Sequence, residues 1–324
     1  MIKALLLITL LTATLAHAQY DARTADYVRA WRIGAAVSLE PWTPADLGND
    51  LALWLDAKDS STLWADTSAT TAATNNGLVA RWDDKSGNDV HFTLQSGDSS
   101  PTWTASSYLR FSGVLRQRLA AEPIDSPSAY WRFLHYGNAT FYSVWRPSES
   151  APASNYRGTL MDNSGGGSGR GFITVLDNRS SSGFTRRLQS ASWASFVSPV
   201  AGYDQNNAIT DASSDLIYGV SLSNLAAVSN RVPFVRLDGN AVAWTNTSSN
   251  TAVDANPDSG MCIGQQSAPN GNFPLNGRIY EIVITSNVIS TESAQKLEGY
   301  LAHKWGLTAN LPAEHPHKDN PPTK

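Results

Sequence analysis

Between residues 51 and 284 the chain is a succession of short apolar runs, each followed by a turn-forming segment. Runs of this length that are rich in β-branched and aromatic residues are typical of strands. The expected strands are residues 51–55, 78–82, 91–94, 108–111, 139–145, 171–176, 216–220, 232–237, 241–244 and 278–284. Asp238-Gly239-Asn240 joins two of them directly, which predicts a β-hairpin. Many short strands with glycine-rich turns predict an all-β sandwich or barrel.

The apolar spacing changes from two to about 3.6 after Ser290, which indicates one helix near the C-terminus. Its apolar stripe consists of Ala294, Leu297, Leu301 and Trp305. Ser290 is a suitable N-cap, and Gly306 a suitable end. We expect the stripe to lie against the sandwich, and the proline-rich tail, residues 307–324, to be extended.

The first residues resemble an export signal. A short basic start is followed by an apolar run from Ala4 to Ala16, and Ala16-His17-Ala18 suits a signal peptidase. The run is shorter than the ~20 residues of a transmembrane span, although a buried core helix of this length is the alternative. We therefore expect a signal peptide at residues 1–18, an adaptor at 19–46 that packs on the sandwich or attaches it to a protein scaffold, and no membrane-spanning segment.

Composition and charge exclude some functions. Only 16% of the residues are charged and the net charge is −4, so no basic stripe is available for nucleic acid. Cys262 is the single cysteine, so no intrachain disulfide forms and the fold must rely on its core.

Two stretches resemble a known family. Residues 51–57 with residues 82–88 (WDDKSGN) resemble the opening of bacterial and phage laminin-G-like jelly rolls, in the concanavalin-A-like lectin/glucanase superfamily. Residues 275–284 and 297–307 (LEGYLAHKWGL) resemble the final strand and closing helix of these domains. The resemblance implies two antiparallel sheets packed face to face over residues 47–306. It also implies a binding activity, often toward carbohydrate, although fold alone does not fix function.

A glycoside hydrolase on this fold would carry carboxylates two residues apart on one strand, on the same face of the sheet. No such run occurs, since Glu281 is the only acid in the last strand and its neighbours are apolar. No nucleophile-elbow motif is present either. We therefore expect no catalytic residues and no enzyme activity.

Calcium is the one cofactor that the loops suggest. Asp254, Asn256 and Asp258 alternate around Pro257 and offer the oxygen ligands that calcium prefers. Ordinary turn chemistry is the preferred explanation of the same residues, because Asp and Asn are common in turns.

The aromatic residues favour a glycan site, since sugars stack their C–H faces on indole and phenol rings. Trp54, Trp82, Trp145, Trp244 and Trp305 lie in strands or on the helix and are expected in the core; Trp64, Trp103, Trp131 and Trp193 lie in polar stretches and are expected to be more exposed. Trp103 and Trp193 are the predicted platform, with Asp162 and Asn163 as partners for sugar hydroxyls or calcium. The predicted site loops are residues 99–107, 162–170 and 193–207.

The sequence thus predicts a secreted or cell-surface binding module for glycans of a cell or matrix. The alternative is a structural or adhesive surface or virion protein, such as a phage appendage component, without a small ligand.

Overall fold

The computed structural model describes residues 40–104, 107–150, 156–165, 169–179, 186–193, 199–205, 209, 211–268 and 272–324. The chain divides into two compact units, residues 1–41 with 323–324 and residues 42–322. Of the first unit only its ends are described, where Lys324 Nζ lies 2.8 Å from Glu40. The predicted signal peptide, and the adaptor up to residue 39, lie outside the described residues.

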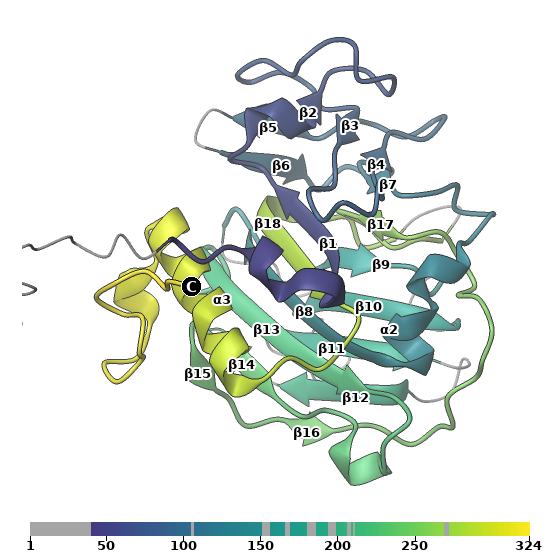
Figure 1. The fold of residues 1–324 in the computed structure, drawn as a ribbon. Coiled ribbons are helices and arrows are strands. Elements are labelled where there is room, and N and C mark those ends of the chain that lie inside the picture. Colours follow the sequence, from purple (N-terminus) through teal and green to yellow (C-terminus); the bar gives the residue numbers. More distant parts are fainter. Residues whose placement is uncertain are drawn as a thin grey trace, which may run out of the picture. The chain divides into compact units, whose positions relative to one another are not determined.

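Residues 42–322 form an all-β sandwich of two antiparallel sheets, as the turn-and-strand pattern predicts (Figure 1). In the described residues, the first sheet has the order β15 (Asn240–Ala241), β14 (Val235–Leu237), β13 (Leu216–Ser223), β8 (Asn138–Arg146), β18 (Asn276–Thr285), β6 (Tyr108–Ser112) and β5 (Thr102–Thr104), and β1 (Leu51–Asp56) also pairs with β18.

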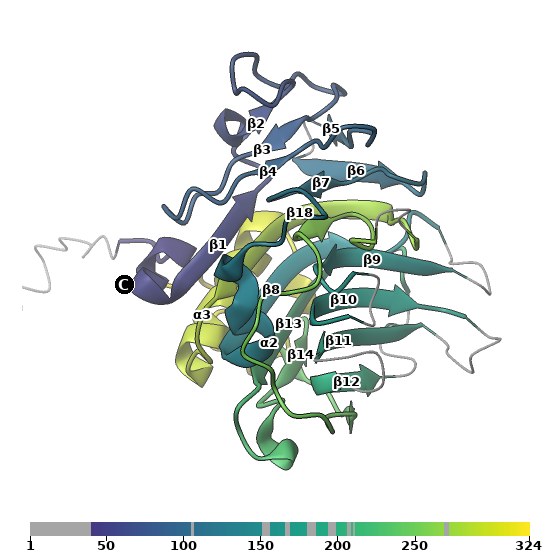
Figure 2. The ribbon, with the colours of Figure 1, turned by 90° about the vertical axis from the view of Figure 1, so that its right-hand side faces the viewer.

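The second sheet lies behind the first as a separate layer (Figure 2). Its order within the described residues is β16 (Thr245–Asn246), β12 (Pro199–Gln205), β11 (Arg187–Trp193), β10 (Gly171–Asp177), β9 (Arg157–Asp162), β17 (Cys262–Ile263), β7 (Leu119–Ala120), β4 (Phe92–Thr93), β3 (Arg81–Trp82) and β2 (Leu63–Trp64).

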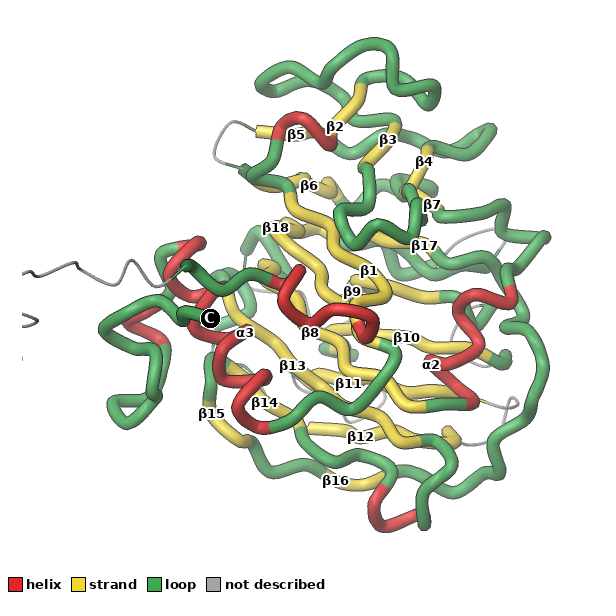
Figure 3. Tube along the Cα trace, in the orientation of Figure 1, coloured by secondary structure: helices red, strands yellow, loops and turns green. Residues whose placement is uncertain are grey.

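Within the part of the chain that the structure describes, helical segments are short apart from one (Figure 3). They are α2 (Phe133–Tyr136), α3 (Thr291–Trp305) and the 3-10 turns Pro44–Asp50, Ser60–Thr62, Ala129–Arg132, Val228–Asn230 and Thr308–Asn310. No described helix has the length and apolar character that a bilayer crossing requires.

The main core fills the space between the sheets. Phe141 and Trp145 of β8 and Tyr218 of β13 meet Phe172 and Leu176 of β10 there. These residues alternate along their strands, as the two-residue period of a strand requires.

Helix α3 covers the outer face of the first sheet (Figure 1). Its buried residues Leu297 and Leu301 belong to one apolar cluster with Tyr142, Val144 and Ile217, which point away from the main core. The predicted helix is confirmed at both ends: Ser290 Oγ accepts a hydrogen bond from Ser293 N at 3.1 Å, and Gly306 ends the helix with φ 72°.

Several local expectations are wrong. The run 78–82 yields only the two-residue β3, and Leu78 is exposed. The predicted loop 193–207 contains strand β12, and the predicted loop 99–107 contains β5. The expected extended tail includes a 3-10 turn and buries Leu311 and His315 within the larger unit.

Candidate functional site

Asn163 joins the two ends of the connection between β9 and β10 by hydrogen bonds to Phe172. Its backbone N donates to Phe172 O at 3.0 Å, and its side-chain Oδ1 accepts from Phe172 N at 2.6 Å. Gly171 has φ 147°, and a Cβ there would lie 2.6 Å from the Asn163 carbonyl oxygen, so glycine permits this approach. The Nδ2 of Asn163 is buried and has no hydrogen-bond partner among the described residues. A buried donor without a partner is costly, but Asn163 is fully buried, so a ligand does not reach its Nδ2.

Asp162 holds the same loop in place through hydrogen bonds to both of its carboxylate oxygens. Oδ1 accepts from Ser164 N at 2.9 Å and from Ser164 Oγ at 2.5 Å, while Oδ2 accepts from Ser267 N and Ser267 Oγ, both at 2.8 Å. Burial raises the pKa of this carboxyl above its ordinary value, against those hydrogen bonds. The predicted side chain is therefore fully buried and holds two loops together, so a sugar hydroxyl does not reach it.

Arg170 and Asp258 clamp the loop to the segment before β17. Arg170 Nη2 lies 2.7 Å from Asp258 Oδ1, and Arg170 N donates to Oδ2 at 2.7 Å. Beside this pair is a hollow of about 350 Å³, lined by Ile124, Asp125, Ser164, Gly165, Gly169, Asp258 and Ser259. The two lining glycines leave the backbone accessible to a ligand. The hollow combines a carboxylate, hydroxyls and open backbone, which are the groups that orient sugar hydroxyls.

Trp193 stands next to this loop in the sheet, as the cross-strand partner of Gly171. It packs partly buried against Ile173, Val175 and Ala191, a small apolar cluster separate from the main core. Its indole Nε1 is buried without a partner in the described part of the chain. Trp193 and Asn163 therefore lie on either side of Gly171, each with an unused donor.

A second hollow adjoins the first, because Ile124 and Asp125 line both. It measures about 370 Å³ and is also lined by Gln95, Ser96, Asp98, Arg116, Arg118 and Pro123. Asp98 pairs with Arg118 at 2.8 Å and with Arg116 at 3.0 Å. The two hollows together offer room for more than one sugar unit.

Trp103 does not belong to this site. It is 9% exposed, belongs to the main core, and donates its indole hydrogen to Ala57 O at 3.0 Å. The expectation of an exposed ring is wrong here, and wrong for Trp131, which is fully buried. Among the rings expected in the core, Trp54, Trp82 and Trp145 are buried, whereas Trp244 and Trp305 are partly buried and pack against the clusters.

The three residues predicted for calcium are engaged otherwise. Asp254 pairs with Arg132 at 3.1 Å, Asn256 gives its backbone oxygen to Arg170, and Asp258 binds Arg170 with both oxygens. Within the described ranges, no group of three or more His, Cys, Asp or Glu side chains is placed to hold a metal ion. As placed, the trio does not form a ligand shell, and calcium dependence stays a prediction.

Sequence reasoning missed Arg170 and Ser259 as parts of the site. Arg170 follows the glycine run directly, so its place beside the loop was available from the sequence. Its partner Asp258 lies 88 residues away, and nothing in the spacing indicates that pairing.

A larger hollow, about 410 Å³, lies by the Asp238-Gly239 hairpin and is lined by Asp211, Asp215, Asp238, Asn240, Asn310 and apolar residues including Val242. Its carboxylates already have partners in the chain. Asp215 accepts from Arg146 at 2.8 Å and from Tyr280 at 2.7 Å, and Asp238 accepts from Ile217 N at 2.8 Å.

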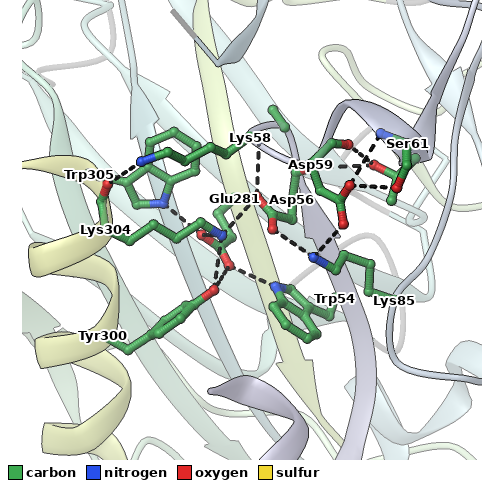
Figure 4. Close-up of polar contacts among 12 residues, drawn as sticks. Trp54, Asp56, Lys58, Asp59, Ser61, Lys85, Glu281, Tyr300, Lys304 and Trp305 are labelled. Carbon is green, nitrogen blue, oxygen red and sulfur yellow. Dashed lines mark hydrogen bonds and ion pairs between the residues drawn. The ribbon is translucent and has the colours of Figure 1, made fainter. Parts of the chain in front are cut away.

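The densest cluster of charges joins β1, β18 and α3 (Figure 4). Glu281 is fully buried, and its oxygens accept from Trp54 Nε1 at 2.7 Å and Trp305 Nε1 at 2.6 Å. Lys304 Nζ lies 2.7 Å from Glu281 and 2.8 Å from Asp56. The side chains fill the space between helix and sheet, so this cluster binds parts of the chain to each other.

No family model matches the sequence, and a search of the curated proteins found no match. Among solved structures, the chain is similar to the binding domain of botulinum neurotoxin serotype D/C, with 11% identity and a TM-score of 0.49 over 80% of this chain and 53% of that one. It is also similar to Trypanosoma rangeli sialidase, with 16% identity and a TM-score of 0.45 over 87% of this chain and 39% of that one. The chain thus spans about half the length of the neurotoxin structure. One architecture hosts many functions, so the function has to come from the site.

Proposed function

We propose that this chain is a non-catalytic carbohydrate-binding module of the laminin-G-like, concanavalin-A-like type, exported to the cell surface or medium. Its binding site is the hollow between the β9–β10 loop and Asp258, with Trp193 as the stacking ring. The observation that carries this proposal is the hollow beside the β9–β10 loop, whose lining includes the Asp258 carboxylate, Gly165 and Gly169. Trp193 is partly exposed and is the cross-strand partner of Gly171, which begins β10 at the end of this loop.

The chemistry of the hollow fits a neutral or weakly charged sugar. Asp258 is compensated by Arg170, and Asp98 by Arg116 and Arg118, so the site has no large net charge to attract an ion. Stacking and a few hydrogen bonds contribute modestly, so we expect a dissociation constant of about micromolar to millimolar.

The test is retention of the full chain on immobilised xylan, chitin, cellulose and β-glucan, followed by affinity measurement on any that retains it. Trp193→Ala should weaken binding at least about tenfold, since it removes the stacking ring. Trp64→Ala is the matched control, because Trp64 is another partly exposed indole whose Nε1 bonds Asp83 at 2.7 Å, away from the site. Circular dichroism shows that both variants are folded.

If both variants bind as the parent does, the site is elsewhere. If the parent is retained on no polysaccharide, the carbohydrate proposal fails, and a structural or adhesive surface or virion protein takes its place.

A further inference from the structure

The cluster around Lys304 places an amine and two carboxyl groups in contact where little water enters. Lys304 Nζ lies 2.8 Å from Asp56 Oδ1 and 2.7 Å from Glu281 Oε2 (Figure 4). The side chains of Lys304, Asp56 and Glu281 are 14%, 5% and 0% exposed. We propose that Lys304 and Asp56 condense into an intramolecular amide bond, with Glu281 as the proton carrier.

The backbone holds the two carboxyl groups together before any reaction. Asp56 of β1 and Glu281 of β18 are direct cross-strand partners, so their side chains leave the sheet on the same face. Two carboxylates so placed repel each other, and one amine from α3 sits between them. The strand pairing and the helix packing thus fix all three groups.

The surroundings suit proton transfer. Trp54 Nε1 and Tyr300 OH donate to Glu281 Oε1 at 2.7 and 3.2 Å, and Trp305 Nε1 donates to Oε2 at 2.6 Å. Burial, together with the negative charge of Asp56, raises the pKa of Glu281 although Lys304 lowers it. A carboxyl group whose pKa is raised accepts a proton from an ammonium more readily than an ordinary carboxylate does.

Lys85 completes the arrangement on the other side of Asp56. Its Nζ lies 2.9 Å from Asp56 Oδ2, the oxygen that Lys304 does not contact. Charge develops on that oxygen when an amine adds to the carboxyl carbon, and a fixed ammonium there stabilises it. Burial raises the pKa of Asp56, but Lys304 and Lys85 together lower it below its ordinary value, so this carboxylate must receive its proton from Glu281.

The step balances without any other reactant. Glu281 takes one proton from the Lys304 ammonium and passes it to Asp56 Oδ1, and the freed amine forms the Nζ–Cγ bond. The adduct then loses a second nitrogen proton, which Glu281 also carries to Oδ1, and the Cγ–Oδ1 bond breaks. One water leaves and Oδ2 becomes the amide oxygen. Glu281 returns to the protonation state that it had before the reaction. The product ties the first strand of the sandwich covalently to its closing helix.

Denaturing mass spectrometry of the full chain tests the bond. We expect an intact mass lower than that of the unreacted chain by one water, and a peptide map in which the segments containing Asp56 and Lys304 are joined. Trypsin should no longer cleave after Lys304, because an amide removes its charge.

Glu281→Gln should give the full, unreacted mass, since glutamine does not carry the proton. Glu149→Gln is the matched control, because Glu149 pairs with Arg278 of the same strand at 2.8 Å and touches none of the reacting groups. It should keep the loss of water.

A parent chain with the full mass, and with trypsin cleaving after Lys304, overturns the proposal. So does a loss of water that maps to Asp238-Gly239, where an aspartyl-glycine sequence can cyclise on its own. A loss of water that persists in Glu281→Gln contradicts the role of Glu281.

Discussion

Trp103 and Trp193 are both indoles with small polar neighbours, and the structure puts them in opposite settings. Trp103 lies between Thr102 and Thr104 in β5, where the middle side chain points to the core and both threonines point outward. Trp193 ends β11 on the outer face of the second sheet. The alternation in Thr-Trp-Thr was the available signal for burial, and flanking polarity alone was misleading.

Trp103→Ala should therefore affect stability and not binding. Removing a buried indole leaves a cavity and an unpaired Ala57 carbonyl, and we expect a loss of about 3–5 kcal/mol in the free energy of unfolding. Urea titration measures that loss, and retention on polysaccharide below the transition should equal that of the parent. Lost retention in a folded Trp103→Ala protein would move the binding site to β5.

At the scale of elements, the sequence predicted those helices and strands whose apolar residues form a clear pattern. The sequence predicted helix α3 with both of its ends, because its apolar stripe repeats over about three turns between a serine cap and a glycine in the left-handed region. The strand β18 was found because its apolar residues are continuous.

Strands β9, β11 and β12 were missed, and in β11 the reason is that small polar residues lie on the core side. Ser190 of β11 faces the core, where its Oγ bonds Tyr218 OH at 2.6 Å and Thr174 Oγ1 at 2.7 Å. A buried hydroxyl with partners costs little, yet it looks like a loop residue in the sequence. Prediction of the candidate site is limited in a similar way. Asn163 was predicted from its loop, but the contact with Gly171 and Trp193 depends on a strand register that no local pattern shows.

The packing of α3 makes a prediction at this scale. Leu301 is fully buried between the helix and the first sheet, so Leu301→Ala should lower the free energy of unfolding by about 2–5 kcal/mol. Glu292→Gln on the same helix changes an exposed group paired only with Lys296, and should cost less than about 0.5 kcal/mol. Equal melting temperatures for the two variants would show that the helix does not support the sandwich.

At the scale of the whole sandwich, one carboxylate joins parts that are far apart in the chain. Glu298 of α3 accepts from Tyr142 OH of β8 at 2.8 Å and from Arg236 Nη2 of β14 at 2.9 Å, and His315 Nε2 of the tail lies 3.2 Å away. The tail is therefore part of the fold. In the sequence, only the prolines of the tail gave a signal, and they predicted an extended segment. The contact between His315 and Glu298 depends on the packing of helix α3, which the composition of the tail does not show.

Glu298 also makes stability depend on pH. Burial would raise its pKa, but the hydrogen bonds from His315, Arg236 and Tyr142 hold that pKa below the ordinary value of 4.5. A carboxyl whose pKa is lowered by folding adds stability above its unfolded pKa, and that contribution is lost as the pH falls through the folded pKa.

Glu298→Gln leaves Arg236 without its counter-ion, so the parent should be more stable by about 3 kcal/mol at neutral pH. Urea titrations of both proteins should show this difference shrinking below about pH 4.5, because groups common to both cancel. A difference that stays constant down to pH 3 would show that Glu298 stabilises the fold through its shape and not through its charge.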